Sequence, residues 1–186
     1  RAKGLHLPIV CNTGGYETVE SVEAWRGYID IWLADLKYVS PALSAELSAA
    51  PDYFPVAAAA IDEMVRQVGA YQIGDDGLMR SGVILRHLVL PGQPENTRRC
   101  IDWVSRTFRP GEVLFSLMSQ YTPVGDLAQW PELQHPVSTA LNDAMYEYLM
   151  DSPITDGFYQ DLDAATGDMI PAFDGTGVSA ANPSLQ

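Results

Sequence analysis

The chain has 186 residues, of which 47% are hydrophobic and 19% charged, a composition typical of a globular protein built around one core. Its formal net charge of −13, without a cluster of Lys and Arg, argues against a nucleic acid or an anionic membrane surface as partner. No apolar run reaches the ~20 residues of a membrane span, so no segment is expected to cross a bilayer.

Only two cysteines occur, Cys11 and Cys100, and neither has a partner nearby in the sequence. This count is typical of a reducing compartment, so we expect a cytoplasmic protein. It also excludes a metal site made from three or four cysteines of this chain. The sequence opens at Arg1 and reaches an apolar strand almost at once, from which we expect a fragment whose N-terminal part is missing.

Apolar, strand-like runs alternate with helical patterns along the chain. The expected strands open the segments 8–17 and 29–38 and continue at 83–90, at 113–118 and in a short fifth strand at 157–160. The expected helices run from Thr18 to about Trp25, over 52–68, from Pro94 to about Phe108 and from Val137 to Met150. Residues 71–82 are expected to form a loop or small hairpin around Asp76 and Gly77.

This alternation predicts an α/β fold, a parallel sheet with outer helices. The near-continuous apolar strands are typical of a parallel sheet that is covered on both faces. Because a closed (β/α)8 barrel typically needs ~250 residues, four or five units make a partial (β/α) barrel. We expect this domain to span residues 1–163 and the stretch 164–186, rich in Gly, Ala, Asp and Ser, to form an irregular or mobile C-terminal tail.

Polar side chains stand where the apolar runs end. In parallel sheets the side chains that meet a ligand lie at the carboxyl ends of the strands, where neighbouring loops converge. Function is therefore expected at Asn12, Asp35, Lys37, Arg86 and Gln120.

Each of these positions also has a purely structural interpretation. Asp35 and Lys37 are two residues apart and share a strand face, so they form either a functional pair or a solvated ion pair. Arg86 interrupts an apolar run, where a charge must face a polar cavity or sit in a buried salt bridge. His87 points to the opposite face, and we expect it to be a satisfied core histidine.

The same ambiguity applies to the loops that follow the first and last of these strands. Gly14 and Gly15 either let the backbone approach a ligand closely or form a tight turn. Gln120 and Tyr121 either hydrogen-bond a ligand or simply finish a strand.

Five segments in order resemble one protein family over about residues 5–150: NTGGYE, DIWLADLKY, SAAPDYFPVAAAAIDEMVRQVG, GVILRHLVLPG and LFSLMSQYTP. The family is that of the radical S-adenosylmethionine proteins related to pyruvate formate-lyase-activating enzyme. Its members hold a 4Fe-4S cluster in an incomplete (β/α)6 barrel through a C-x-x-x-C-x-x-C loop. The open iron of the cluster binds the amino and carboxylate groups of S-adenosylmethionine.

The resemblance implies a parent enzyme that reductively cleaves S-adenosylmethionine to a 5′-deoxyadenosyl radical, which abstracts a hydrogen atom. It implies a glycyl radical enzyme as a protein substrate and flavodoxin or ferredoxin as electron donor. The triple-cysteine loop is absent from this chain, so the ligands of the 4Fe-4S cluster are expected upstream of Arg1. The chain alone is then expected to be inactive.

The resemblance also implies roles for individual residues. Asn12 and Thr13 would line the cofactor pocket, and Asp35 and Lys37, the family's D-x-K, would reach the ribose and methionine portion.

The remaining two roles fall on later strands. Arg86, in the family's R-x-x-V-x-P-G strand, would meet the carboxylate of the cofactor or substrate through its planar donor fork. Gln120 stands roughly where some relatives have a histidine near the ribose.

Two other functions remain open at this stage. Lys37 beside Asp35 on a barrel strand is also the arrangement of a Schiff-base lysine in an aldolase-like enzyme. Alternatively, the protein is a cluster-free relative that binds S-adenosylmethionine as a scaffold module.

Overall fold

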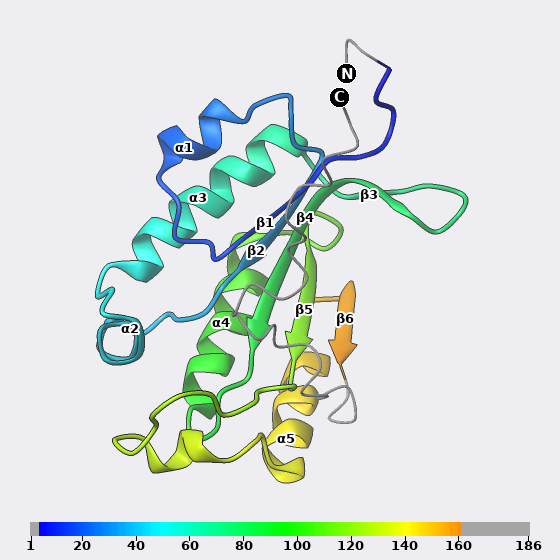
Figure 1. Ribbon diagram of the computed structural model, residues 1–186. Helices are drawn as coiled ribbons and strands as arrows, with labels where there is room; N and C mark the ends of the chain where they lie inside the picture. The colour runs from blue at the N-terminus through cyan, green and yellow to red at the C-terminus, as the bar shows by residue number, and fades with distance from the viewer. Residues whose placement is uncertain (1–3, 161–186) are drawn as a thin grey trace, which may run out of the picture.

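The computed structural model describes residues 4–160, and these residues form one α/β unit (Figure 1). The expected tail at 164–186 lies outside the described residues. Between residues 4 and 160 no helix is both long enough and apolar enough to span a membrane.

The described strands form one sheet. They are β1 (Val10–Thr13), β2 (Ile31–Asp35), β3 (Gln72–Ile73), β4 (Met79–Leu88), β5 (Leu114–Met118) and β6 (Gly157–Gln160). Within this part of the chain, β1, β2, β4, β5 and β6 are parallel and adjacent in that order. Short β3 pairs antiparallel with the start of β4, which confirms the hairpin expected at 71–82. The α/β class and the partial barrel are therefore confirmed.

The helices connect successive parallel strands. They are α1 (Val19–Ala24), α2 (Pro41–Ser48), α3 (Tyr53–Val68), α4 (Pro94–Thr107), α5 (Thr139–Met150) and the 3-10 turn η1 (Pro131–Gln134). The four predicted helices are confirmed as α1, α3, α4 and α5. Helix α2 was not predicted, although its start carries recognisable signals: Ser40 caps the Leu43 amide and Pro41 occupies the first helical turn.

The helices gather on one side of the sheet. In Figure 1, α3 lies to the left of β1 and β2 with α1 beside it, α4 lies behind β4, and α5 lies below the ends of β5 and β6. The side chains that face them are sealed from solvent and form the main core: Trp32, Ala34 and Leu36 of the β2 segment, Val83, Leu85 and Val89 of the β4 segment, and Phe115 and Leu117 of β5. Burial of this apolar surface is the dominant favourable term in folding.

The opposite sheet face is only partly covered. On this face Leu33, Asp35, Ile84 and Arg86 keep partial exposure, whereas their neighbours in the chain are buried. The sequence predicted a sheet covered on both faces, with outer helices; among the described residues the helices cover one face. The strands read as continuous apolar runs because this second face also carries aliphatic side chains, such as Leu33 and Ile84, although no described helix packs on it.

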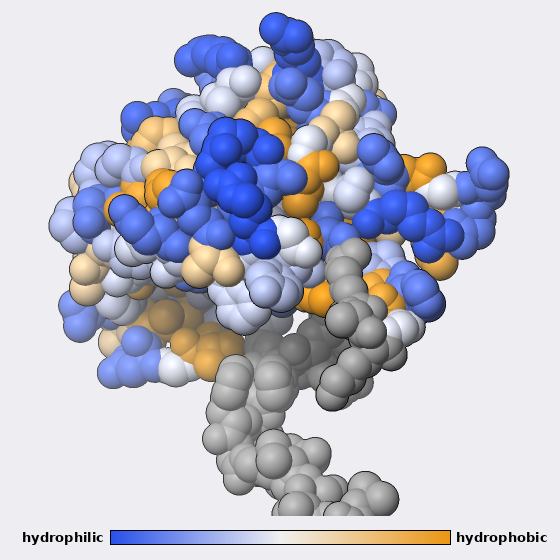
Figure 2. All heavy atoms as spheres, turned by 90° about the horizontal axis from the view of Figure 1, so that it is seen from above, coloured by the Kyte–Doolittle hydropathy of each residue, from blue (hydrophilic) through white to orange (hydrophobic). Residues whose placement is uncertain are grey.

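Single apolar side chains are scattered over the surface. Leu7, Ile73 and Leu78 are more than half exposed. Figure 2 shows apolar patches interspersed with hydrophilic side chains on the upper face of the molecule. Scattered exposure of this kind is normal for a folded domain.

His87 lies on the helix-facing side of β4 and is completely buried. Its Nδ1 is 2.6 Å from the Leu36 carbonyl oxygen, and its Nε2 is 3.0 Å from the Thr97 hydroxyl on α4. Because the carbonyl can only accept, Nδ1 carries the proton and Nε2 accepts from Thr97. The expectation of a satisfied core histidine is confirmed.

This histidine makes the stability of the fold depend on pH. Burial lowers the pKa of His87 to about 4 from its ordinary value of 6.5. The unfolded chain thus binds a proton between pH 6.5 and 4 that the folded chain does not, so stability falls as the pH falls through this window. Between pH 7 and pH 5 we expect a loss of about 2 kcal/mol from this group.

Urea unfolding at pH 7 and pH 5 measures this loss. The His87→Gln variant should lose most of the difference, whereas His135→Gln, which changes an exposed histidine, should retain it. An equal pH dependence in wild type and His87→Gln would contradict the assignment.

Candidate functional site

The carboxyl ends of three neighbouring strands bring four polar side chains together. Asp35 on β2 and Arg86 on β4 are direct partners in the parallel register. Asn12 comes from β1 on the far side of β2. Lys37 follows Asp35 by two residues and so extends from the same face. The structure therefore gathers four of the six predicted site residues in one cluster, called here the strand-end cluster: Asn12, Asp35, Lys37 and Arg86.

Arg86 is the centre of this cluster. Its Nε and one Nη lie 2.9 and 2.7 Å from the same oxygen of Asp35, Oδ1. The same Nη donates to the Asn12 side-chain oxygen at 2.6 Å. The Arg86 and Asp35 side chains are 25% and 22% exposed, so the pair is neither a solvated surface pair nor a fully buried one. The guanidinium is fixed in place and remains accessible to a ligand.

Lys37 completes the charge arrangement. Its Nζ lies 4.0 Å from Asp35 Oδ2, the oxygen that Arg86 leaves unused, and its side chain is 48% exposed. The cluster thus holds two cationic groups against one carboxylate. In a chain whose formal net charge is −13, this is a local positive site that favours a negatively charged ligand group.

A cavity of about 560 Å³ opens beside the cluster. Its walls are formed by Asp35, Lys37, Tyr38, Arg86, Leu88, Leu90, Met118, Gln120, Tyr121 and Thr122. Cavities that bind small molecules typically measure ~300–1,000 Å³ and combine apolar walls with a few polar groups. Size and lining therefore both match a ligand pocket.

Gln120 adds an unsatisfied group to this cavity. Its side-chain oxygen is shielded from solvent and has no hydrogen-bond partner in the described part of the chain. A buried polar atom without a partner costs roughly 1–3 kcal/mol. Because this oxygen is shielded, a ligand in the cavity would reach it only after the Gln120 side chain rotates.

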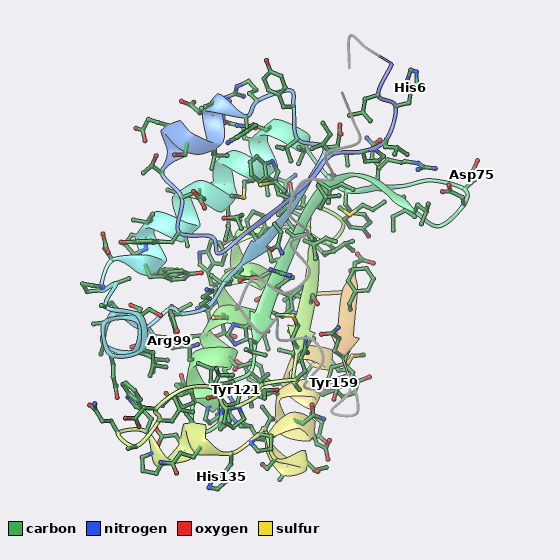
Figure 3. The ribbon with its side chains drawn as sticks, viewed as in Figure 1. His6, Asp75, Arg99, Tyr121, His135 and Tyr159 are labelled. Atoms are coloured by element: carbon green, nitrogen blue, oxygen red, sulfur yellow. The ribbon has the colours of Figure 1, made fainter. Side chains whose placement is uncertain are left out.

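Tyr121 belongs to the same end of the sheet. Figure 3 places it beyond the arrowheads of the parallel strands, whereas Asp75 marks the hairpin tip at the opposite end. Its hydroxyl donates to the Leu133 carbonyl at 2.8 Å. Tyr121 therefore anchors the loop after β5 while its side chain lines the cavity.

Thr13 is placed differently from the expectation. Its hydroxyl donates to Glu17 at 2.7 Å and accepts from the Gly15 amide at 3.2 Å, so it shapes the turn after β1. It does not line the cavity. Asn12 is not a wall residue of the cavity either, but it reaches the site through Arg86.

The two glycines after β1 serve different purposes. Gly15 has φ +79° and lies so close to β2 that a Cβ would stand 2.2 Å from the Asp35 carbonyl oxygen. Its close approach is thus to the neighbouring strand end, which supports the tight-turn interpretation. A Cβ on Gly14 would instead lie 3.6 Å from Lys37 Nζ, beside the site itself.

Cys11 lies partly buried on β1, and Cys100 is buried on α4. Burial raises the pKa of the Cys100 thiol above its ordinary value, which disfavours the thiolate that binds metals. Among residues 4–160 no three His, Cys, Asp or Glu side chains are grouped as metal ligands.

The Gly15 geometry can be tested with a matched pair of variants. Gly15→Ala should destabilise the fold more than Gly77→Ala, because both positions have a left-handed φ but a Cβ at Gly77 meets no atom within 4 Å. The left-handed conformation costs both variants roughly 1–2 kcal/mol. Overpacking against β2 adds about 1–3 kcal/mol for Gly15 alone. Equal free energies of unfolding for the two variants would contradict the close approach.

No family model matches the chain. The chain is similar to an uncharacterized protein of Methanocaldococcus jannaschii, MJ0674, with 26% identity over 129 residues. The match covers 69% of this chain and 33% of that protein, so the chain corresponds to about a third of its relative's length.

Proposed function

We propose that the strand-end cluster and the adjoining cavity bind S-adenosylmethionine, and that the parent protein is a radical S-adenosylmethionine enzyme. The observation that carries the proposal is the fixed Arg86 guanidinium, held by Asp35 and Asn12 at the mouth of a cavity of about 560 Å³. The ordered resemblance of five sequence segments is the second support. The parent protein's whole activity is part of the proposal, because this chain matches only part of its relative.

The charges of the cluster suit the amino acid end of the cofactor. Arg86 uses its Nε and Nη2 on Asp35 and Asn12, whereas its Nη1 makes no hydrogen bond among the described residues and can donate to one carboxylate oxygen of a ligand. Lys37 adds a second cation beside it. Asp35 Oδ2 faces the same space and can accept from an ammonium or a hydroxyl group.

The rest of the cavity suits the nucleoside end. Leu88, Leu90 and Met118 provide apolar walls, and Tyr38 provides an aromatic one. Gln120 also lines the cavity, and after a rotation of its side chain the amide can hydrogen-bond a ribose hydroxyl or an exocyclic amine. The cations therefore suit the carboxylate of S-adenosylmethionine, and the volume and apolar walls of the cavity suit its nucleoside.

The 4Fe-4S cluster does not fit the described residues in the same way. The chain has two cysteines in all, and no cysteine belongs to a group of metal ligands among residues 4–160. Ligands for a cluster would have to come from a part of the parent protein outside this sequence. We therefore assign no step of the reaction to an iron atom held by this chain.

S-adenosylmethionine supplies, on one-electron reduction, a 5′-deoxyadenosyl radical that abstracts a hydrogen atom from a substrate. The role of this chain is then to bind and orient the cofactor. Arg86 and Lys37 hold its carboxylate end, Asp35 fixes the two cations relative to each other, and the apolar walls exclude water from the nucleoside. Positioning of this kind lowers the entropic part of the barrier.

Calorimetric titration with S-adenosylmethionine tests the assignment. Lys37→Ala and Asp35→Ala should each weaken binding at least tenfold, about 1.4 kcal/mol, because each removes a charge that contacts or orders the ligand. Asp76→Ala is the matched control, since its carboxylate pairs with Arg80 on the hairpin at the other end of the sheet. Unchanged affinity in both cluster variants would refute the site.

The lysine-based alternative has less support in the geometry. A Schiff-base lysine is activated by desolvation or by a neighbouring cation. Arg86 is such a cation, but the Asp35 carboxylate contacts both charges, and Lys37 is half-exposed. The scaffold alternative shares the cofactor site, and it would be favoured if the intact parent chain lacked a cysteine loop.

A further inference from the structure

Tyr53 is the first residue of α3 and is 3% exposed, with its hydroxyl directed at the strand ends. The hydroxyl oxygen lies 2.7 Å from the Asp35 carbonyl oxygen and 3.0 Å from the Gly14 carbonyl oxygen. It also accepts a hydrogen bond from the Lys37 amide at 3.0 Å. One phenol therefore contacts backbone atoms of Gly14 after β1, of Asp35 at the end of β2 and of Lys37 two residues later.

These contacts begin where the sheet ladder stops. The last paired residues of β1 and β2 are Thr13 and Ala34. Beyond them the β1–β2 register does not continue, and the Tyr53 hydroxyl contacts the carbonyl oxygens of both Gly14 and Asp35. Gly15 lies beside this hydroxyl, because a Cβ here would stand 3.2 Å from the Tyr53 hydroxyl oxygen as well as 2.2 Å from the Asp35 carbonyl oxygen.

The phenol is itself held firmly. Tyr38 packs edge-on against its ring, with centroids 5.4 Å apart, and Tyr16 stacks on it at 5.7 Å. The Tyr16 hydroxyl donates to the Asp52 carboxylate at 2.6 Å, immediately before Tyr53. Asp52 makes no capping hydrogen bond to α3. Through Tyr16 it instead links the turn after β1 to the start of that helix.

We propose that Tyr53 is a positioning residue for the strand-end cluster. Its hydroxyl sets the separation of the β1 and β2 ends and thereby the spacing of Asn12, Asp35 and Lys37 around Arg86. The proposal requires that the cluster is a ligand site. It rests on the proposed function only in the experiment that uses S-adenosylmethionine as the probe.

The mechanism of positioning depends on the hydroxyl group rather than on the ring. Burial raises the pKa of Tyr53 above its ordinary value, so the phenol keeps its proton. It can then donate to one carbonyl while accepting from the Lys37 amide. A phenylalanine at this position preserves the packing of the ring and removes the bridge alone.

The test compares Tyr53→Phe with Tyr148→Phe in the 186-residue chain. Tyr148 is a suitable control because its hydroxyl also makes one hydrogen bond, to Asp102 at 2.8 Å, between α5 and α4. Nuclear magnetic resonance measures solvent exchange of the Lys37 amide and of the Arg86 Nε proton. In Tyr53→Phe both should exchange about tenfold faster or more, and in Tyr148→Phe neither should change.

A purely structural role for Tyr53 would lower the melting temperature and leave the Arg86 Nε proton unchanged. That result would overturn the proposal. If Tyr53→Phe does not fold, the exchange rate of the Lys37 amide in the wild type remains as a test. Lys37 follows the end of β2, so its amide hydrogen bond goes to the Tyr53 hydroxyl and not to a neighbouring strand. Its amide should be protected by the Tyr53 hydroxyl alone, and unprotected exchange in the wild type would also overturn the proposal.

Titration with S-adenosylmethionine separates the two proposals. If the wild type binds this probe, Tyr53→Phe should bind it about tenfold more weakly, and equal affinity would count against positioning. If the wild type does not bind it, the proposed function fails. The Arg86 exchange rate then decides the role of Tyr53 independently.

Discussion

The ion pair between Arg86 and Asp35 is the interaction on which the arrangement of the site depends. An arginine inside an apolar strand is costly unless its charge is paired and its donors are used. Here the parallel register places Asp35 beside it, and Asn12 reaches it across β2. Asp35 Oδ1 contacts Arg86, and Asp35 Oδ2 faces Lys37. This pair therefore orients the charged side chains of the cluster relative to one another.

The hydrophobic core and the candidate site lie on opposite faces of the sheet. Side chains that point toward the helices are sealed and apolar, and His87 is satisfied there by two hydrogen bonds. The opposite face carries the charged cluster and the cavity. Since consecutive residues of a strand point to opposite faces, Arg86 and His87 serve these two roles side by side. Helix α3 connects the two faces, because its length packs on the core while Tyr53 contacts the strand ends.

Local pattern predicted much of this architecture. The alternation of apolar runs and helical periods identified the parallel strands and four helices, and the two-residue period placed Asp35 and Lys37 on one face. The short helix α2 was missed because eight residues carry too weak a periodic signal, although Ser40 and Pro41 marked its start. The strand residues also did not indicate that the described helices cover only one face of the sheet. An aliphatic strand residue looks the same in sequence whether a helix, another segment or a cavity faces it.

The sequence by itself determined which chemical groups stand at the strand ends, since the end of each apolar run identifies them. Only the tertiary structure decided which of them meet. Asn12 and Arg86 are 74 residues apart, and their contact depends on strand order and register, which no local period encodes. The same holds for Gly15, whose close neighbour is the Asp35 carbonyl, and for Thr13, which turns to Glu17. Tyr53 lies in an ordinary helix-start pattern, and its bridging role arises only where α3 crosses the ends of two strands.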